Sequence, residues 1–236
     1  MSSLKQKLVM GWDITLMLLN MTRMVFNPKD ISPIFKGRTF RNHRSFQVAL
    51  ASLHADPETH ALIESRYLAP KPIDLDALAQ LPEGTLGRVF AEHMRHYKLE
   101  VVFYPPLEDQ ENDDITYLRK RARQTHDIHH VVLGFPATEP GEMMISAFYL
   151  AQNKIPLSGL LLGFGFFHVV LKAPERADEL VEAIIKGWTL GKAAHKKVLG
   201  VKWEEYWEVP IDEVRRMIGV EVATDSLPPE PQAVAG

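Results

Sequence analysis

The apolar residues of this chain recur mostly at intervals of three and four, and few stretches alternate with a period of two. Intervals of three and four place side chains on one face of an α-helix, whereas alternation is typical of a half-buried strand. Proline and glycine residues fall between the periodic stretches, at positions where helices begin and end. We therefore predict an all-α fold.

Local chemistry predicts several helix boundaries. Asp56 can cap a helix whose first residue is Pro57, and Pro174 and Pro210 begin helices in the same way. Gly219 ends the last helix. The predicted helices cover residues 4–25, 44–54, 57–65, 74–80, 86–97, 114–133, 142–153, 157–171, 174–199 and 211–218, and the only predicted strand covers 99–104. These helices, about ten, form a single domain over residues 1–221, followed by a disordered, proline-containing tail over residues 222–236.

The composition excludes several classes of function. The formal net charge of -3 gives no basic domain of the kind that nucleic-acid-binding proteins carry, so we expect no nucleic-acid partner. The chain has no cysteine, which excludes disulfides, thiolate nucleophiles, iron–sulfur clusters and cysteine zinc sites. Any metal must therefore be held by nitrogen and oxygen atoms.

The N-terminal segment favours attachment to a membrane surface. Asp13 interrupts its apolar stretch, and neither a small-residue cleavage site nor an arginine-rich transit sequence is visible, so we expect no signal or transit peptide. Apolar residues recur here at helical spacing: Leu4, Leu8, Trp12, Leu16 and Leu19. We interpret this segment as an amphipathic helix that holds the protein peripherally on the cytoplasmic face of a membrane.

The longest apolar run covers residues 155–171, which is too short to span a bilayer. One interpretation is a buried core helix, in which Gly159 and Gly163 let a neighbouring helix approach closely. The other is a groove for a long lipid tail. One helical stripe would line that groove: Leu157, Leu161, Phe164, Phe167 and Leu171.

Residues 126–130, together with Glu142, carry side chains of the types that bind metals. Successive helical residues turn by about 100°, so His126, Asp127 and His130 share one quadrant of a helix, whereas His129 points elsewhere. Four helix-interrupting residues follow, and they force a reversal of the chain: Gly134, Pro136, Pro140 and Gly141. Glu142 would then open the next helix and face back toward the same point. Two imidazoles and two carboxylates suit zinc, iron(II) or manganese, and also magnesium where water completes the shell.

Other interpretations of these histidines stay open. A His-x-x-x-His pair on a helix often arises by chance. The similarity to H-E-x-x-H zinc proteases is superficial, because Asp127 replaces the glutamate that would be the general base. The adjacent His126 and Asp127 are also typical of HD-type metal phosphohydrolases, whose sites need a further upstream histidine, which His93 or His96 would have to supply.

Basic residues precede the histidines on the same predicted helix. Arg119 and Arg123 lie seven and three residues before His126, on nearly the same face. One interpretation is that residues 119–123 form a solvated basic run. The other is that Arg123 orients Asp127 or binds an anionic substrate group near the metal.

The spacing of these residues resembles a known family signature. His126-Asp127-x-x-His130, followed after eleven residues by Glu142, resembles the HDxxH-(x)11-E signature of the Coq-four family of ubiquinone (coenzyme Q) biosynthesis proteins. Residues 81–88, LPEGTLGR, are similar to the family's LP-x-GTLGR segment, and residues 117–121 and 207–215 are also family-like. The resemblance covers about residues 10–220.

The resemblance implies an all-helical, membrane-associated homodimer that handles polyprenylated quinone precursors within a quinone biosynthetic complex. It implies a divalent metal, usually zinc, on His126, Asp127, His130 and Glu142. These residues would be catalytic in the replacement of the ring C1 carboxylate by hydroxyl, an oxidative decarboxylation. We assign the substrate head group to Arg123 and Arg88. His129 departs from the family, which often has an aromatic residue there, and could add a ligand or a proton carrier.

The candidate metal ligands and the family resemblance support hypotheses of different classes. The first is a metal-dependent decarboxylase and hydroxylase of a prenylated hydroxybenzoate, in which the metal stabilises negative charge on the ring substituents. The second is a non-enzymatic scaffold that binds prenyl lipids and uses the metal structurally or to anchor a head group. An HD-like metal phosphohydrolase is a third. Access to the metal discriminates the first two, because a catalytic site keeps an open coordination position, whereas the phosphohydrolase would require a second metal or an upstream histidine at the cluster.

Overall fold

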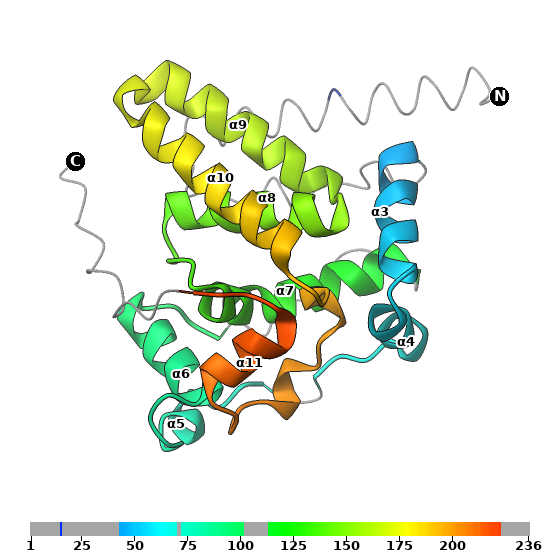
Figure 1. Ribbon diagram of the computed structural model, residues 1–236, viewed down its shortest axis with the longest axis vertical. Helices are drawn as coiled ribbons and strands as arrows, with labels where there is room; N and C mark the ends of the chain where they lie inside the picture. Colours follow the sequence, from blue (N-terminus) through cyan, green and yellow to red (C-terminus); the bar gives the residue numbers. More distant parts are fainter. Residues whose placement is uncertain (1–14, 16–42, 70–71, 102–112, 223–236) are drawn as a thin grey trace.

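The computed structural model describes residue 15 and residues 43–69, 72–101 and 113–222. These residues form nine α-helices: α3 (Arg44–His54), α4 (Pro57–Ser65), α5 (Leu75–Leu78), α6 (Leu86–His96), α7 (Asp114–Leu133), α8 (Glu139–Asn153), α9 (Pro156–Lys172), α10 (Ala177–Ala193) and α11 (Ile211–Ile218) (Figure 1). Three short 3-10 helices cover Pro174–Arg176, Val198–Gly200 and Trp203–Glu205. The prediction of a single all-helical domain is confirmed.

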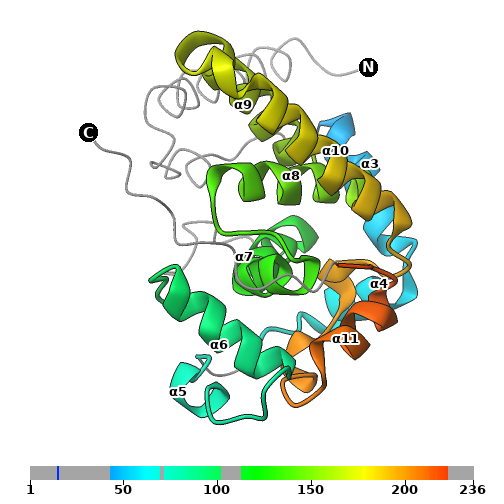
Figure 2. The ribbon, with the colours of Figure 1, turned by 60° about the vertical axis from the view of Figure 1, so that its left-hand side comes forward.

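The helices are stacked in layers that leave α7 and α8 in the middle of the molecule. Figure 2 shows α9 and α10 on one side of α8, and α7 between α8 and α6. The contacts between helices support this arrangement, because α8 contacts α7, α9 and α10, and α6 contacts α7. The main core combines residues of several layers, among them Phe90, Ile128, Phe148 and Trp203. The two helices that carry the predicted metal ligands therefore face each other inside the fold.

Several predicted boundaries are confirmed by the capping contacts. Asp56 Oδ1 accepts a hydrogen bond from the Thr59 backbone N–H at 2.8 Å, and Pro57 occupies the first turn of α4. Gly219 follows α11 in the left-handed conformation, with φ of 74°. Local residues alone determine these ends, which is why the sequence predicts them.

Other predicted elements differ from the structure. Helix α8 begins at Glu139, three residues early, because Thr138 caps it and Pro140 fits its first turn. The predicted helix over 174–199 ends at Ala193, because the backbone N–H groups of His195 and Lys196 turn to the Ile218 carbonyl. No strand forms over residues 99–101, and the rest of the predicted strand lies outside the described residues. So do the N-terminal amphipathic helix, except residue 15, and the tail beyond residue 222.

The two segments that carry part of the family resemblance lie side by side. Thr85, in the segment LPEGTLGR, forms an isolated antiparallel bridge with Pro210. The backbone N–H of Leu86 donates to the Val209 carbonyl at 2.9 Å, and that of Gly87 to the Trp207 carbonyl at 2.8 Å. The start of α6 is thereby fixed against the segment that leads into α11.

The close helix approach occurs at a different pair of glycines from the one predicted. A Cβ atom on Gly187 or Gly191 of α10 would collide with the backbone of α8, at Met144 and Phe148 respectively. A Cβ on Gly159 would meet only ordinary contacts, and one on Gly163 would meet no described atom within 4 Å. The small residues that let two helices approach closely are therefore on α10, not on α9.

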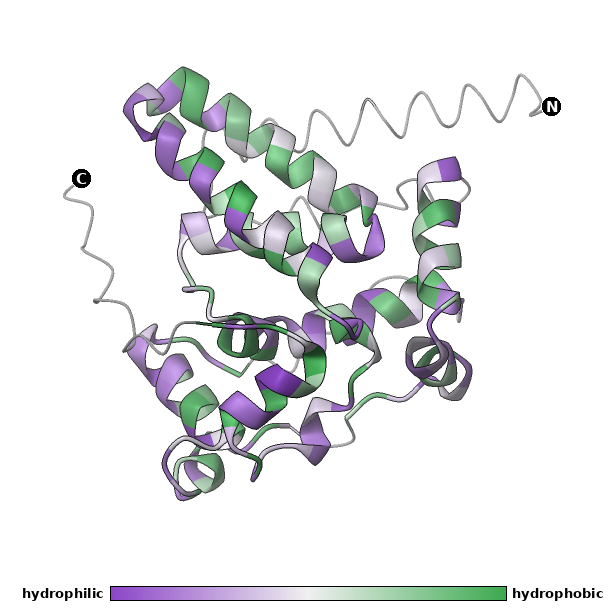
Figure 3. Ribbon diagram, viewed as in Figure 1, coloured by the Kyte–Doolittle hydropathy of each residue, from purple (hydrophilic) through white to green (hydrophobic). Residues whose placement is uncertain are grey.

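The interpretation of residues 155–171 as a buried core helix is wrong. Of α9, only Ser158, Leu162 and Val169 are buried. Figure 3 shows hydrophobic residues along much of α9, at the outer edge of the molecule. Of the stripe predicted to line a lipid groove, Leu157, Leu161 and Phe164 are half-buried, and Phe167 and Leu171 are exposed. Within the described residues, no helix is both long and apolar enough to cross a membrane.

Candidate metal centre

Helices α7 and α8 bring two histidines and a glutamate together. Nε2 of His126 lies 3.2 Å from Nε2 of His130. The Glu142 carboxylate lies 3.3 Å from Nε2 of His126 through Oε2 and 3.1 Å from Nε2 of His130 through Oε1. One ligand atom from each residue falls within 4.8 Å of the others. Residues from two helices thus converge on one point, as the chain reversal predicts.

The distances and the donor types fit a divalent metal. A tetrahedral metal with ligand bonds of about 2.0–2.2 Å holds its donor atoms roughly 3.3–3.6 Å apart, and octahedral coordination brings neighbouring donors roughly 3.0 Å apart. The three separations here, 3.1, 3.2 and 3.3 Å, lie at these values. Imidazole nitrogen and carboxylate oxygen are the donors that zinc, iron(II) and manganese accept. The residues present therefore fit the metal that the sequence predicts.

The orientation of His130 is set by the end of its own helix. Helix α7 ends at Leu133, where Gly134 adopts a φ of 66° and the Phe135 N–H donates to the His130 carbonyl at 2.9 Å. Nδ1 of His130 lies 3.3 Å from the Phe135 carbonyl oxygen and can donate its proton there. Metal-binding histidines commonly use a backbone carbonyl in this way, because it leaves the other nitrogen unprotonated. Nε2 is then free to bind the metal.

Gly141 allows Glu142 to reach α7. A Cβ atom at Gly141 would collide with the Pro136 carbonyl oxygen, so the first turn of α8 packs directly on the loop that follows α7. From the sequence alone, Gly141 is expected to interrupt the chain between two helices. In the structure it lies within the first turn of α8, and its missing side chain brings the glutamate toward the histidines.

Charges in the cluster support one another. Burial lowers the pKa of His126, but the hydrogen bond and charge of Glu142 and the charge of Asp127 outweigh it and raise that pKa above 6.5. Burial raises the pKa of Glu142, but its hydrogen bonds with His126 and His130 and their charges bring it well below its usual range. The ionised carboxylate is the form that binds a metal, whereas the proton that the raised pKa favours on His126 would have to leave when a metal binds.

Asp127 and His129 lie outside the close group. Asp127 is not among the residues whose ligand atoms lie within 4.8 Å of one another. Burial raises its pKa more than the charges of His126 and His130 lower it. The His129 ring has other partners, because its Nε2 accepts from the Trp203 indole N–H at 2.9 Å and its Nδ1 lies 2.5 Å from Tyr149 Oη. The sequence gives no signal of this buried network, because Trp203 is 74 residues away.

The arginines before the histidines do not form a solvated run. Arg121 is fully buried, and its guanidinium contacts Glu204 at 2.6 Å and donates to the Val201 carbonyl at 2.7 Å. Arg119 and Arg123 are half-buried. Arg88, predicted to bind a head group, contacts Glu92 at 2.5 Å and the Ala79 carbonyl at 2.6 Å. Arg121 is therefore a structural link, and Arg88 already has partners within its own part of the fold.

A further histidine from α6 reaches the centre. The His93 ring stacks on the His130 ring, with the two centroids 6.4 Å apart and an angle of 25° between the planes. His93 does not belong to the group of close ligand atoms. Burial, with smaller effects from the charges of His130 and His96, lowers the pKa of His93 to about 4. An upstream histidine thus lies beside the cluster, but beyond the distance of a shared ligand atom.

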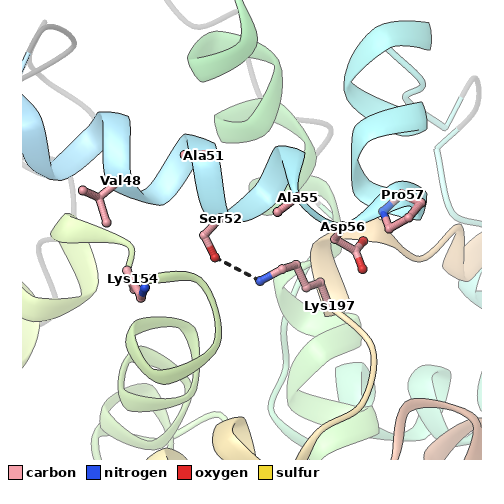
Figure 4. Close-up of a pocket in the computed structure, with 8 residues that line it drawn as sticks. All are labelled: Val48, Ala51, Ser52, Ala55, Asp56, Pro57, Lys154 and Lys197. Carbon is pink, nitrogen blue, oxygen red and sulfur yellow. Dashed lines mark hydrogen bonds between the residues drawn. The ribbon is translucent and has the colours of Figure 1, made fainter.

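An open pocket of about 650 Å³ lies elsewhere, between α3, the start of α4 and the turn between α8 and α9 (Figure 4). The ammonium group of Lys197 contacts Ser52 Oγ at 3.2 Å, the Gln152 carbonyl at 3.0 Å and Asn153 Oδ1 at 3.1 Å. These three acceptors occupy all three protons of the ammonium group. None of the predicted site residues lines this pocket.

His54 has a structural role at the junction of α3, α4 and α7. Its Nε2 lies 2.9 Å from Asp114 Oδ2, and Arg66 lies 2.5 Å from the other oxygen of the same carboxylate. These contacts join the ends of α3 and α4 to the first residue of α7. His54 is therefore unsuitable as a neutral control for changes at the metal centre.

The sequence matches a protein family and several curated proteins, as the family-like segments predict. The model of the family "Coenzyme Q (ubiquinone) biosynthesis protein Coq4" matches residues 12–224. The ubiquinone biosynthesis protein COQ4, mitochondrial, of Coprinopsis cinerea is 26% identical over 70% of this chain and 56% of its own length. The mitochondrial COQ4 homolog of Rattus norvegicus is 29% identical over 70% of this chain and 62% of its own length. The chain thus spans somewhat less than two thirds of the length of these relatives.

A solved structure has the same fold. The crystal structure of a Nostoc punctiforme PCC 73102 protein, named for ubiquinone biosynthesis, is 34% identical to this chain, with a TM-score of 0.75. The match covers 89% of this chain and 99% of that one. The family model covers nearly the whole chain, and the helices agree in space with this relative. The chain belongs to the Coq4 family of coenzyme Q (ubiquinone) biosynthesis proteins.

Proposed function

We propose that this protein holds a divalent metal, zinc first among the candidates, on His126, His130 and Glu142, with Asp127 as the fourth ligand. We further propose that it uses the centre to replace the C1 carboxylate of a polyprenylated hydroxybenzoate by hydroxyl. The observation that carries the proposal is the spacing of the donor atoms of His126, His130 and Glu142, between 3.1 and 3.3 Å. Membership of the family supports the pathway, since the family is that of ubiquinone biosynthesis.

The chain's own residues would bind and orient the substrate beside the metal. A bound divalent metal would supply Lewis-acid stabilisation of negative charge on the ring carboxylate or phenolate. The α7–α8 reversal keeps its donors in place, since Gly134 and Gly141 fix the ends of the two helices. We propose that Arg123 binds an anionic substituent of the ring from the previous turn of α7. We propose Arg88 for the same head group, although its contacts with Glu92 and Ala79 would have to be exchanged.

The reaction needs reagents that the chain does not contain. When dioxygen is the oxidant, exchange of the carboxylate for hydroxyl releases carbon dioxide and water. Counted from the ionised carboxylate, the reaction consumes two electrons and three protons, so an external reductant is required. The test is metal analysis of protein purified without oxygen, followed by incubation of loaded protein with a prenylated hydroxybenzoate, dioxygen and a reductant. A hydroxylated, decarboxylated ring is expected, and a loaded site without product would reject the enzymatic proposal.

A second candidate function is a non-enzymatic scaffold that binds prenyl lipids. The exposed apolar surface of α9 favours it, because Phe167, Val170 and Leu171 are each more than 60% exposed. Native mass spectrometry of freshly purified protein would report metal and carried lipid together. Bound lipid without turnover of any prenylated hydroxybenzoate is the result that favours the scaffold over the enzyme.

We also propose that the apolar surface of α9 and α10 attaches the protein to a membrane surface or to a second copy of the chain. Large apolar side chains lie exposed on both helices: Phe166, Phe167, Val170, Leu171, Val181, Ile185 and Trp188. Replacing Phe167 and Ile185 with serine should release the protein from vesicles or convert a dimer to a monomer. Vesicle flotation and light scattering distinguish the two, and no change in either would reject both.

A further inference from the structure

The last turn of α6 places a group of polar aromatic side chains next to the metal centre. His93 is 95% buried, since only 5% of its surface is exposed. The His93 ring lies 4.8 Å from that of Tyr97, and the His96 ring lies 4.7 Å from the same tyrosine, both measured between centroids. These three side chains form a small polar group on the side of His130 that faces α6.

The buried nitrogen atoms of this group lack partners. Nε2 of His93 and Nε2 of His96 are inaccessible to solvent, and neither has a hydrogen-bond partner among the residues that the structure describes. Most buried side-chain polar atoms in proteins have one, so each exception calls for an explanation. A structural role does not explain His93, because an apolar ring of similar size would fill the same space without leaving a polar atom unpaired. The position of His93 is explained if its partner is a molecule that binds there.

The distance between His93 and the candidate metal ligands indicates where such a molecule would bind. His93 stacks on His130 at 6.4 Å between centroids, yet it lies outside the group of ligand atoms within 4.8 Å. A side chain in that position is too far away to share the metal with His130, but it is near enough to contact a molecule bound to the metal. Outer contacts of this kind orient metal-bound groups in many metal sites.

We propose that His93 forms a hydrogen bond with an oxygen atom of the ligand that binds at the metal centre, an aromatic carboxylate or phenolate, and so determines which ring oxygen the metal accepts. The Tyr97 ring packs against His93, and the His96 ring packs against Tyr97. The inference rests on the proposed metal centre and adds a binding residue that the HDxxH-(x)11-E signature does not include.

The test uses zinc and a simple probe, 4-hydroxybenzoate, with isothermal titration calorimetry on the full chain. His93→Phe should weaken binding of the probe to zinc-loaded protein about tenfold, because one buried hydrogen bond is lost. His93→Gln keeps a polar atom near the position of Nε2 and should stay within about threefold of the parent protein. Zinc affinity should be unchanged in both variants. His195→Phe, at an exposed histidine, is the control and should change neither affinity.

A second readout separates binding from a structural role. Because His93→Phe removes an unpaired buried nitrogen, the metal-free variant should melt at or above the temperature of the parent protein. If His93→Phe does not fold, His93→Leu tests the same loss of the hydrogen bond.

The results separate failure of the inference from failure of the metal centre. Unchanged probe affinity in the apolar variant, or no probe binding to the zinc-loaded parent, overturns the role of His93 and leaves the metal centre standing. Absence of zinc binding in the parent itself overturns the metal centre and the inference together.

Discussion

Oε1 of Glu142 lies 3.1 Å from Nε2 of His130, although the two residues belong to different helices and are separated by a reversal of the chain. His130 is almost completely buried, whereas the side chain of Glu142 retains 47% of its exposure. One ligand is therefore fixed by the core, and the other lies on the open side of the cluster. The candidate metal centre is thus anchored in α7 and is open to solvent at Glu142.

Removal of His130 should abolish tight metal binding. His130→Ala deletes one of the three donors that lie within 4.8 Å of one another, and it leaves His126 as the only imidazole of the proposed ligand set. We expect zinc affinity to fall by more than about 100-fold, since even changes to outer contacts cost about 10–100-fold. Competition with a chelator measures the affinity, and circular dichroism checks that the helices remain.

The matched control for that change is His195→Ala. His195 is exposed and lies in the loop after α10. The His195→Ala variant should bind zinc with an affinity within about twofold of the parent value, because substitutions at the surface usually have small effects. If His130→Ala binds zinc as tightly as His195→Ala does, the metal is not held by α7.

The sequence predicts what depends on neighbouring residues, and it misses what depends on distant ones. The bounds of α3, α4, α7 and α11 are predicted to the residue, because caps such as Asp56 and Gly219 act locally. The convergence of Glu142 on His130 is predicted because a short chain reversal leaves few alternatives. By contrast, the partner of Arg121 is Glu204, 83 residues away, and no local pattern indicates that pair.

The wrong prediction of which glycines lie in a close helix contact has the same cause. Gly159 and Gly187 each precede another glycine by four residues, so the two pairs look alike in sequence. Only the packing of α10 on α8 shows that Gly187 and Gly191 are the ones in close contact. The early start of α8 is a different case, because Pro140 and Gly141 interrupt a helix interior but are tolerated in a first turn.

A methyl group at Gly141 should weaken metal binding without touching a ligand. In Gly141→Ala the new Cβ collides with the Pro136 carbonyl oxygen, so the first turn of α8 must move and Glu142 moves with it. We expect zinc affinity to fall at least about tenfold, as for other changes that misplace a ligand. Gly84→Ala is the control, because Gly84 has a φ of 76° but no described atom within 4 Å of an added Cβ. That variant should lose about 1 kcal/mol of stability from backbone strain and keep its zinc affinity.

Acid should weaken the junction of α3, α4 and α7 through Asp114. Burial raises the pKa of Asp114, but hydrogen bonds and charges from Arg66 and His54 outweigh it and hold that pKa below 3.8. A depressed carboxyl pKa adds stability above the unfolded-state value, and that stability is lost as the pH falls through the folded-state value. Asp114→Asn should therefore lower the free energy of unfolding by about 1 kcal/mol at pH 7, and the difference should shrink below about pH 4.

Denaturant titrations of the parent and of Asp114→Asn at pH 7 and at pH 3 measure that difference. Asp76→Asn is the control, because Asp76 pairs with Arg95 on the surface with 94% of its side chain exposed. It should show no resolvable change at either pH. A difference for Asp114→Asn that stays constant between pH 7 and pH 3 would show that the carboxylate charge does not stabilise the junction.

The position of Gly163 gives a direct test of the lipid-tail groove on α9. In Gly163→Phe the new ring enters space in which a Cβ meets no described atom within 4 Å. Overpacking, which costs about 1–3 kcal/mol in a filled core, is therefore not expected, and the melting temperature should hold. A ring at this position should block a long polyprenyl tail beside Phe164 and Phe167 but spare a short one.

Gly187→Ala is the matched control, because its Cβ collides with the Met144 carbonyl oxygen and should lower the melting temperature. Binding of long-tailed and short-tailed forms of the same prenylated hydroxybenzoate, measured with the melting curves of both variants, decides the matter. Equal loss of both tail lengths in Gly163→Phe, together with a fall in melting temperature, would place Gly163 in a packed interface and not in a groove.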